Sequence, residues 1–402
     1  MGAASGVYKQ ASYKKEATFG TKPSAASAQS MRRESIDLNL QKDSYGSNEI
    51  RQDLQKADFR HGVGRVSGKV SADLSPRTWA DFIGSFCKRP FTAAPSIAGL
   101  SITISGSGPY TVTRSSGSWL TDGVKVGNVG RLTAGSFNVS NSNKNLFVTA
   151  VTALSLTVIT LNGSTLVAEG PIASATFALT GKQSWIPTTG HVEESYTFEQ
   201  FYPEVPAGEI FTGCKISSLT VDLPPTGIAK IGFDVMGRAL ESTTTQYFTS
   251  PTAPTTTASL ASVNGVLRAG GQVVAVLTGL NINGAANYSG DPVVGSNVIP
   301  QFFAGMVEVS GQATAYFDST ALRDAFVNET EIDIVGVFTT DNSATADFIS
   351  FIMPRVKVNN FTKSDGAGAV IATIPFQALL NGAGGVGAAT EKTTLMIQDS
   401  AA

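Results

Sequence analysis

The chain has 402 residues, of which 15% are charged, and it contains 41 glycines and two cysteines. This length allows two or three domains, and low charge with many glycines is typical of an all-β protein rich in turns. No run of about 18 apolar residues occurs, which excludes a membrane-spanning helix, and the first residues lack the apolar segment of a signal peptide. Cys87 and Cys214 provide no disulfide framework and suit assembly in a reducing cytoplasm.

The net charge of −2 is unevenly distributed along the chain. Residues 1–95 carry 15 Lys and Arg against 9 Asp and Glu, a balance of +6, whereas the remainder carries 14 against 22, a balance of −8. Such polarity favours head-to-tail stacking of subunits through electrostatic complementarity. The alternative is that the basic start is solvated surface.

The first third of the chain predicts an arm, a strand and a helix. Residues 1–33 are polar, so we expect an extended N-terminal arm, followed by the first part of a module at 34–96. From Val66 to Leu74, small apolar residues alternate with polar ones, which predicts a strand with one apolar face. Ser75 and Pro76 predict the start of a helix. Its core stripe consists of Trp79, Phe82, Ile83 and Phe86.

The remaining elements divide into four segments. Residues 97–181 contain almost no charge and many turn signals, which predicts a small all-β domain inserted into the module. Residues 182–241 complete the module, and the Thr, Pro and Ser-rich segment 242–263 predicts a linker. Residues 264–402 form a second module.

The two modules share a pattern that indicates an internal duplication. Val66-Ser67-Gly68 recurs at Val309-Ser310-Gly311, an offset of 309 − 66 = 243, and the strand phase is the same in both copies. A helix start at Asp318-Ser319 matches the first copy. The second helix stripe consists of Leu322, Ala325 and Phe326. The polar strand residues are Ser67, Lys69, Ser71 and Asp73 in the first copy and Ser310, Gln312, Thr314 and Tyr316 in the second.

A search for chemistry gives no catalytic or metal site. His61, His191, Cys87 and Cys214 could serve as zinc ligands, but no two of them stand at zinc-finger spacing. Neither a phosphate-binding loop nor a nucleophile elbow is present. We therefore expect no cofactor, no metal and no enzymatic activity.

The sequence resembles the tail-tube, or major tail, proteins of bacteriophages with long non-contractile tails. The resemblance rests on KKEATFGTKPSAASAQSMRRES at 14–35, GRVSGKVSADLSPRTWADFIGSF at 64–86, FTGCKISSLTVDLPPTGIAKIGFDVMG at 211–237 and TIPFQALLNG at 373–382. It implies a mainly β fold of two tandem sandwich or barrel modules with short flanking helices, plus the inserted β domain. It also implies stacked rings around a channel that conducts DNA, a virion location, and transient partners in the tape-measure protein, the DNA and the tail-end proteins.

Family rings usually contain six modules, so a duplicated chain would close a ring with three copies, whereas a single-module chain would need six. A strand with one polar face at a module edge can pair with a neighbour and close a barrel without free edges. The polar strand residues of both copies are then candidates to line the channel. The alternative is that these faces point outward to solvent.

Two other functions fit the same sequence. A baseplate or tail-terminator ring would use the module without stacking. A receptor-binding or carbohydrate-binding tail protein would act through the inserted domain at 97–181.

Overall fold

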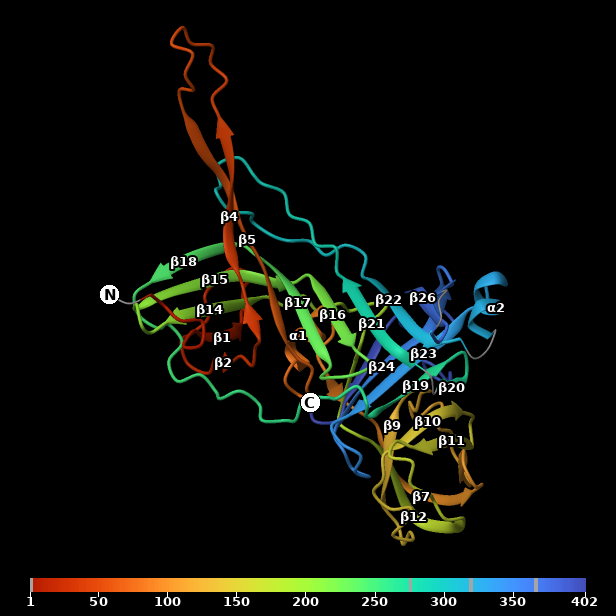
Figure 1. Cartoon of the computed structure of the whole chain (residues 1–402). Helices are drawn as coiled ribbons and strands as arrows, with labels where there is room; N and C mark the ends of the chain where they lie inside the picture. Colours follow the sequence, from red (N-terminus) through yellow and green to blue (C-terminus); the bar gives the residue numbers. More distant parts are fainter. Residues whose placement is uncertain (1–2, 275–276, 318–320, 365–367) are drawn as a thin grey trace.

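The computed structural model describes residues 3–274, 277–317, 321–364 and 368–402. The described chain is mainly β with two short helices, and it includes a closed six-stranded barrel (Figure 1). The predicted fold class, mainly β with short flanking helices, is confirmed. Neither described helix is long and apolar enough to cross a membrane.

Most of the strands outside the barrel fall into two sets. The first set consists of β1 (Gln10–Lys15), β2 (Gln29–Ser30), β3 (Ser35–Ile36), β4 (Asn39–Gly46), β5 (Phe59–Asp73), β14 (Tyr196–Tyr202), β15 (Ala207–Ile216), β16 (Ser218–Leu223), β17 (Lys230–Gly237) and β18 (Ala239–Thr243). The second set consists of β19 (Gly265–Ala269), β20 (Gln272–Val274), β21 (Leu277–Ala285), β22 (Glu308–Tyr316), β23 (Ile332–Thr339), β24 (Phe348–Val358), β25 (Thr362–Lys363), β26 (Ile371–Ala378) and β27 (Met396–Asp399). Helix α1 (Ala80–Phe86) follows β5, and α2 (Ala321–Val327) follows β22.

The strands of the two sets pair in the same order. In the first set β4 pairs with β5, β5 with β17, and β17 with both β16 and β15. In the second set β21 pairs with β22, β22 with β26, and β26 with both β25 and β24. The outer strands correspond as well, since β15 pairs with β14 and β18 whereas β24 pairs with β23 and β27.

One hydrophobic core runs through both sets. In strands with one exposed face, alternating residues face the core, as in β26, where every second residue from Ala372 to Ala378 is buried. The core extends from Phe82 of α1 through Leu219 and Ile282, which lie where the sets meet, to Phe376 of β26. The strands of the two sets join through the antiparallel pairing of β16 with β21. The two sets therefore form one continuous structure.

The β4–β5 hairpin projects far from the body, whereas its counterpart in the second set does not (Figure 1). We call residues 47–58, at the end of this hairpin, the tip loop, and residues 286–307, between β21 and β22, the clasp loop. The clasp loop lies along the base of the hairpin, where the Gly64 N–H donates to the carbonyl of Asn297 over 2.9 Å. The sequence did not predict this projecting hairpin.

The barrel consists of β7 (Ser96–Ser105), β8 (Tyr110–Arg114), β9 (Val129–Ala134), β10 (Leu146–Val151), β11 (Ser155–Thr160) and β12 (Glu169–Leu179). It has its own core around Trp119 and Phe177, and two short strands, β6 (Thr92–Ala93) and β13 (Lys182–Trp185), connect it to the body. Because β13 pairs with β27, the barrel is attached at the edge of the second set.

Two local expectations from the sequence were wrong. Residues 10–15 lie within the segment predicted as an extended arm, yet they form β1, which pairs with β14 and buries Tyr13. Helix α1 begins at Ala80 and not after Ser75, whose hydroxyl instead contacts Thr78 Oγ1 at 2.7 Å. In the first case, pairing with a distant strand outweighs the local signal. The predicted cap at Asp318-Ser319 lies outside the described residues.

Candidate assembly surfaces

A continuous sheet with one polar face joins both strand sets. Its strands follow one another in the order β4, β5, β17, β16, β21, β22, β26 and β25, a run of eight. The face opposite the core carries the polar residues predicted from the strand alternation. Of these, Ser67, Ser71, Asp73, Ser310 and Thr314 are half-buried, and Lys69, Gln312 and Tyr316 are exposed.

The cations on this face stand beside carboxylates. Lys230 Nζ lies 2.8 Å from Asp73 Oδ1, and Arg65 lies 3.7 Å from Asp43. Lys69 stands opposite Asp234 in the β5–β17 register. The part of the face contributed by the second set consists largely of neutral Ser, Thr, Asn and Gln side chains. The face therefore offers little uncompensated positive charge.

Both ends of the eight-strand run have open edges. Among the described residues, β4 pairs along its length with β5, and β25 pairs with β26, so each strand keeps one edge without a strand partner. Unpaired backbone N–H and C=O groups at a sheet edge favour pairing with another strand. These two edges are therefore candidate contacts between copies.

The junction between β16 and β21 shows how an equivalent edge is closed inside the chain. Thr220 stands opposite Asn283 in this antiparallel register. Phe86, at the end of α1, packs on Gly284 of β21, where an added Cβ would lie 2.2 Å from the ring. Phe86 is fully buried as a result.

The clasp loop is held on the first set by a partly buried cluster of charged and aromatic side chains, which we call the clasp site: Lys88, Glu193, Lys215, Tyr288 and Phe302. Glu193 lies 3.2 Å from Lys88 Nζ and 2.9 Å from Lys215 Nζ, and it accepts a 2.7 Å hydrogen bond from the Tyr288 hydroxyl. Lys215 also donates to the carbonyl of Phe302 over 3.1 Å. Phe302 itself is buried and meets Phe19 edge-on.

Burial and charge act in opposite directions in the clasp site. Burial lowers the pKa of Lys88, and the charge of Glu193 partly offsets that effect. Burial alone would raise the pKa of Glu193, but hydrogen bonds from Lys215 and Tyr288 and the two ammonium charges outweigh it, so the pKa lies below its ordinary value. Glu193 is thus held as a carboxylate that links both lysines to the clasp loop.

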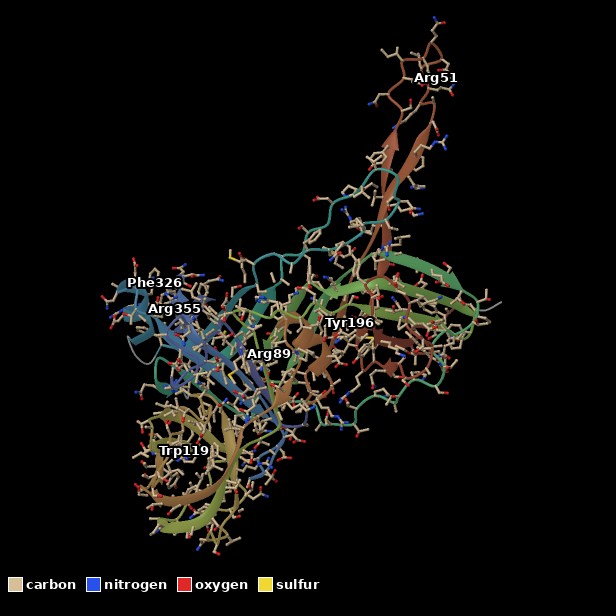
Figure 2. The ribbon with its side chains drawn as sticks, turned by 180° about the vertical axis from the view of Figure 1, so that it is seen from behind. Arg51, Arg89, Trp119, Tyr196, Phe326 and Arg355 are labelled. Atoms are coloured by element: carbon tan, nitrogen blue, oxygen red, sulfur yellow. The ribbon has the colours of Figure 1, made fainter. Side chains whose placement is uncertain are left out.

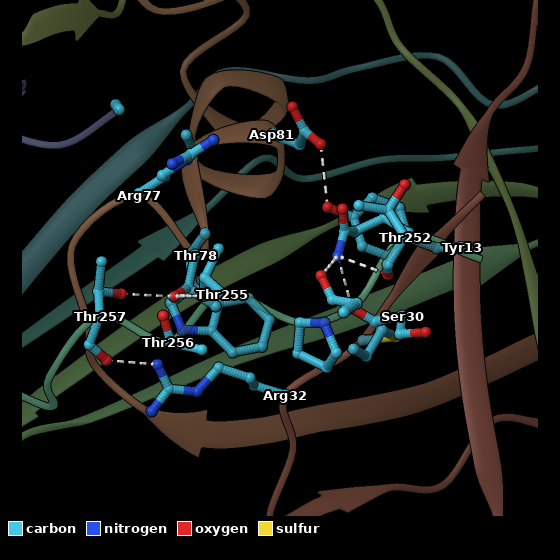
Figure 3. Close-up of a pocket in the computed structure, with 17 residues that line it drawn as sticks. Tyr13, Ser30, Arg32, Arg77, Thr78, Asp81, Thr252, Thr255, Thr256 and Thr257 are labelled. Atoms are coloured by element: carbon cyan, nitrogen blue, oxygen red, sulfur yellow. Dashed lines mark hydrogen bonds between the residues drawn. The ribbon is translucent and has the colours of Figure 1, made fainter. Parts of the chain in front are cut away.

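A polar pocket of about 420 Å³ lies between the N-terminal segment, the start of α1 and residues 252–257 (Figure 3). Arg32 donates to the carbonyl of Thr257 over 2.6 Å, and the Tyr13 hydroxyl donates to Asp81 over 2.9 Å. Burial, followed by the nearby Asp81 charge, raises the pKa of Tyr13. The Arg32 contact fastens the predicted linker to the first set.

The predicted core-helix residues differ between the two helices. Trp79, Phe82, Ile83 and Phe86 are all buried in the first set. In the second set Ala325 is buried, but Phe326 is 36% exposed, which contradicts its predicted core position. The reason is that, among the described residues, no strand covers the end of α2 as β21 covers the end of α1. Leu322 lies outside the residues whose side chains are described.

The residues considered for metal binding do not come together. Cys87 and Cys214 are both buried and unpaired, and burial raises the pKa of Cys87 to about 12. His61 lies on the projecting hairpin, and His191 is exposed near the clasp site. Among the described residues, no group of three or more His, Cys, Asp and Glu is placed to hold a metal ion.

A polar-faced sheet with two open edges is typical of a protein that pairs with further strands. Residues 9–378 match the family described as phage tail tube protein, which is essentially the whole chain. The chain belongs to this family and is a structural component of the virion tail. No curated protein sequence matches it.

Proposed function

We propose that three copies of the chain close a ring whose inner wall is the eight-strand run, and that such rings stack into a tube that conducts DNA. The continuous sheet with open edges at β4 and β25 carries this proposal. Three copies would contribute 3 × 8 strands, and closing them into a barrel would leave no free edge. The tape-measure protein and then the DNA would occupy the channel, tail-end proteins would close it, and assembly would take place in the host cytoplasm.

The matched pairing of the two strand sets supports a duplicated module. Val66 stands opposite Leu40 on one side and Gly237 on the other. Val309 stands opposite Gly284 and Ala378. Each set is then one ring module, spanning roughly 34–96 with 182–241 and 264–402. The segment 97–181 is the insertion between the two parts of the first module.

The β16–β21 junction supplies the register for the contact between copies. Thr220 and Thr362 are counterparts, because Thr220 faces Gly232 as Thr362 faces Thr373. Asn283 and Asn39 are counterparts, because they face Ser310 and Ser67. The internal Thr220–Asn283 pair therefore predicts that Thr362 of one copy faces Asn39 of the next.

Side-chain volumes at the two junctions are complementary. Phe86 and Val327 are counterparts because each is the last residue of a seven-residue helix, and the strand register makes Leu40 the counterpart of Gly284. Val327 is 67% exposed in the single chain, and Leu40 is half-buried. Within the chain, the large Phe86 packs on the small Gly284. Between chains, Val327 would pack on Leu40, two side chains of intermediate size that fill a similar space.

The polar face suits a conduit for DNA. Each phosphate neutralised by Lys or Arg releases counterions and adds affinity that would hold the DNA in place. On this face Lys230 and Arg65 already have carboxylate partners within 4 Å. A channel wall of paired charges and neutral polar groups therefore lets DNA slide.

Electron micrographs of assembled material test the proposal. We expect rings of three copies with a mass of 3 × 41.8 = 125.4 kDa, pseudo-sixfold in projection, and tubes built from such rings. True sixfold rings of six chains would contradict the trimer, and monomers in every assembly condition would contradict the tube.

A further inference from the structure

The tip loop and the clasp loop occupy the same position in their strand sets. The isolated pair between Ser289 and Phe303, just inside the clasp loop, corresponds to the Tyr45–Arg60 pair of the β4–β5 hairpin. This match follows the strand registers, in which Gly284 and Val309 correspond to Leu40 and Val66. Phe302 of the clasp loop is therefore the counterpart of Phe59.

These two phenylalanines have opposite surroundings. Phe302 is 1% exposed, and its carbonyl accepts a hydrogen bond from Lys215. Phe59 is 53% exposed and makes an edge-on contact with His61. Phe59 is one of several large apolar side chains exposed on this projecting hairpin, and such a concentration is typical of a surface that another chain covers. The others are Tyr45, Ile50 and Leu54.

The second set has a cleft where the first set has the clasp site. Backbone hydrogen bonds at the end of α1, from Lys88 to Ser85 and from Arg89 to Gly84, recur at the end of α2, from Glu329 to Phe326 and from Thr330 to Ala325. Glu329 has a φ of 53°, close to the 57° of Lys88.

The strand side of the cleft corresponds as well. Lys215 pairs with Met236, next to Gly237, and Lys357 pairs with Gln377, next to Ala378, so Lys357 is the counterpart of Lys215. A cleft of about 440 Å³ lies between the α2 end and β24 and is lined by Phe326, Val327, Glu329 and Lys357. In the first set the equivalent position holds the clasp loop.

We propose that Phe59 of one copy occupies the cleft at Glu329 and Lys357 of the neighbouring copy in the ring, as Phe302 occupies the clasp site within the chain. This inference rests on the proposed ring. If β4 pairs with β25 of the neighbour, the base of the β4–β5 hairpin lies beside that copy's second set, as β21 lies beside the first set. Within one chain the hairpin tip at Arg51 and the cleft residue Phe326 lie far apart, so the contact joins different copies (Figure 2).

A photo-crosslink between differently labelled copies tests the contact. Phe59→Cys is labelled with a benzophenone maleimide and assembled with ¹⁵N-labelled chains, since Cys87 and Cys214 are fully buried and react poorly. We expect cross-links from position 59 to ¹⁵N peptides that contain residues 325–330 or 357–359. Phe303→Cys, at another exposed phenylalanine, is the matched control and should not label those peptides.

Rings counted by microscopy in the same samples separate the two proposals. Rings whose position 59 cross-links elsewhere, including to a chain of the next ring, would overturn the Phe59 contact and leave the ring intact. Absence of rings with the unlabelled chain would instead overturn the proposed function.

An alanine substitution measures the contribution of the contact. Phe59→Ala should raise the protein concentration needed for half-maximal ring assembly roughly tenfold, because a buried aromatic anchor contributes more than 1 kcal/mol to an interface. Phe303→Ala should change that concentration less than about twofold. Equal values for both variants would contradict the proposal.

Discussion

The two strand sets pair alike but cover their outer layers differently. In the first set, residues 16–20 and the 242–263 segment lie across β14 and β15. The buried Glu16 accepts hydrogen bonds of 2.8 Å from the backbone N–H of Gly20 and of Gly213, and the buried Glu199 accepts from Phe248 N over 2.9 Å. In the second set the barrel covers β23, β24 and β27.

The barrel cover combines an apolar contact with buried amide side chains, among them Gln398. Val129 and Phe147 of the barrel pack with Val337, Ile352 and Met396 in a cluster of their own. Gln398 donates to the carbonyls of Val129 and Thr180 over 2.7 and 2.8 Å and accepts from Val129 N over 3.0 Å. The outer strands of a set can thus be covered by hydrogen-bonded segments or by a packed domain. We call the covering segments of the first set, residues 16–20 and 242–263, the strap. The inserted barrel is therefore a structural part of the body, and its removal would expose apolar surface.

The largest loss of stability is expected at the contact between the barrel and the second set. Phe147→Ala should lower the free energy of unfolding by about 4 kcal/mol, because it removes a fully buried ring from the contact. Chemical denaturation followed by fluorescence measures this loss. Val139→Ala, on the exposed surface of the barrel, is the control and should change stability by less than about 0.5 kcal/mol. Similar values for both would show that the barrel does not stabilise the second set.

Removing the buried Glu16 carboxylate of the first set should cause the second-largest loss of stability. Glu16→Ala leaves two backbone N–H groups and the hydroxyls of Ser195 and Thr197 without their acceptor. We expect a loss of roughly 3 kcal/mol in the same denaturation experiment. Glu241→Ala, which removes the exposed partner of Lys22, serves as the comparison and should cost less than about 1 kcal/mol. A Glu16 variant no less stable than this control would exclude the strap as a stabilising cover.

The smallest predicted effect is a pH dependence of the stability, which arises from Asp399 at the edge of the second set. Burial raises the pKa of Asp399 to about 6, although backbone N–H groups of Ala401 and Arg77 partly oppose the effect. Between pH 4 and 6 the folded chain therefore holds a proton that the unfolded chain releases. This contribution to stability is present at low pH and is lost as pH rises through about 6.

The wild-type protein should accordingly gain roughly 1 kcal/mol relative to Asp399→Asn when the pH falls from 7 to 5. Denaturation curves of both proteins at the two pH values measure the difference. A stability difference between them that does not change with pH would contradict the raised pKa.

Strand alternation predicted the fold class and the polar face because both depend on local sequence. The period-2 pattern from Val66 to Leu74 separates the buried Val66, Val70 and Ala72 from the polar Ser67 and Lys69. Burial of the first helix stripe followed from the spacing of Trp79, Phe82 and Phe86. The exposure of Phe326 could not be predicted, because the end of a helix is buried only where a neighbouring strand covers it.

The long-range contacts within the chain could not be predicted from the sequence either. The clasp site brings Lys88, Lys215 and Tyr288 together from three distant segments, and no local pattern links them. Tyr13 lies in a segment whose polarity indicates an arm, yet its ring packs against Phe82 with centroids 4.7 Å apart. The repeated Val-Ser-Gly lies in β5 and β22, and the matched pairing of these two strands gives the register proposed for the ring.

The ring register is the central claim, and a disulfide between copies tests it most directly. Asn39→Cys and Thr362→Cys in one chain should, after mild oxidation of assembled material, give a closed covalent trimer of about 125 kDa on a non-reducing gel. The matched variant, Asn39→Cys with Lys363→Cys, places the second thiol on the opposite face and should remain monomeric. Cross-linking of the Lys363 variant, a covalent ring of six chains, or no cross-linking in well-formed rings would contradict the account.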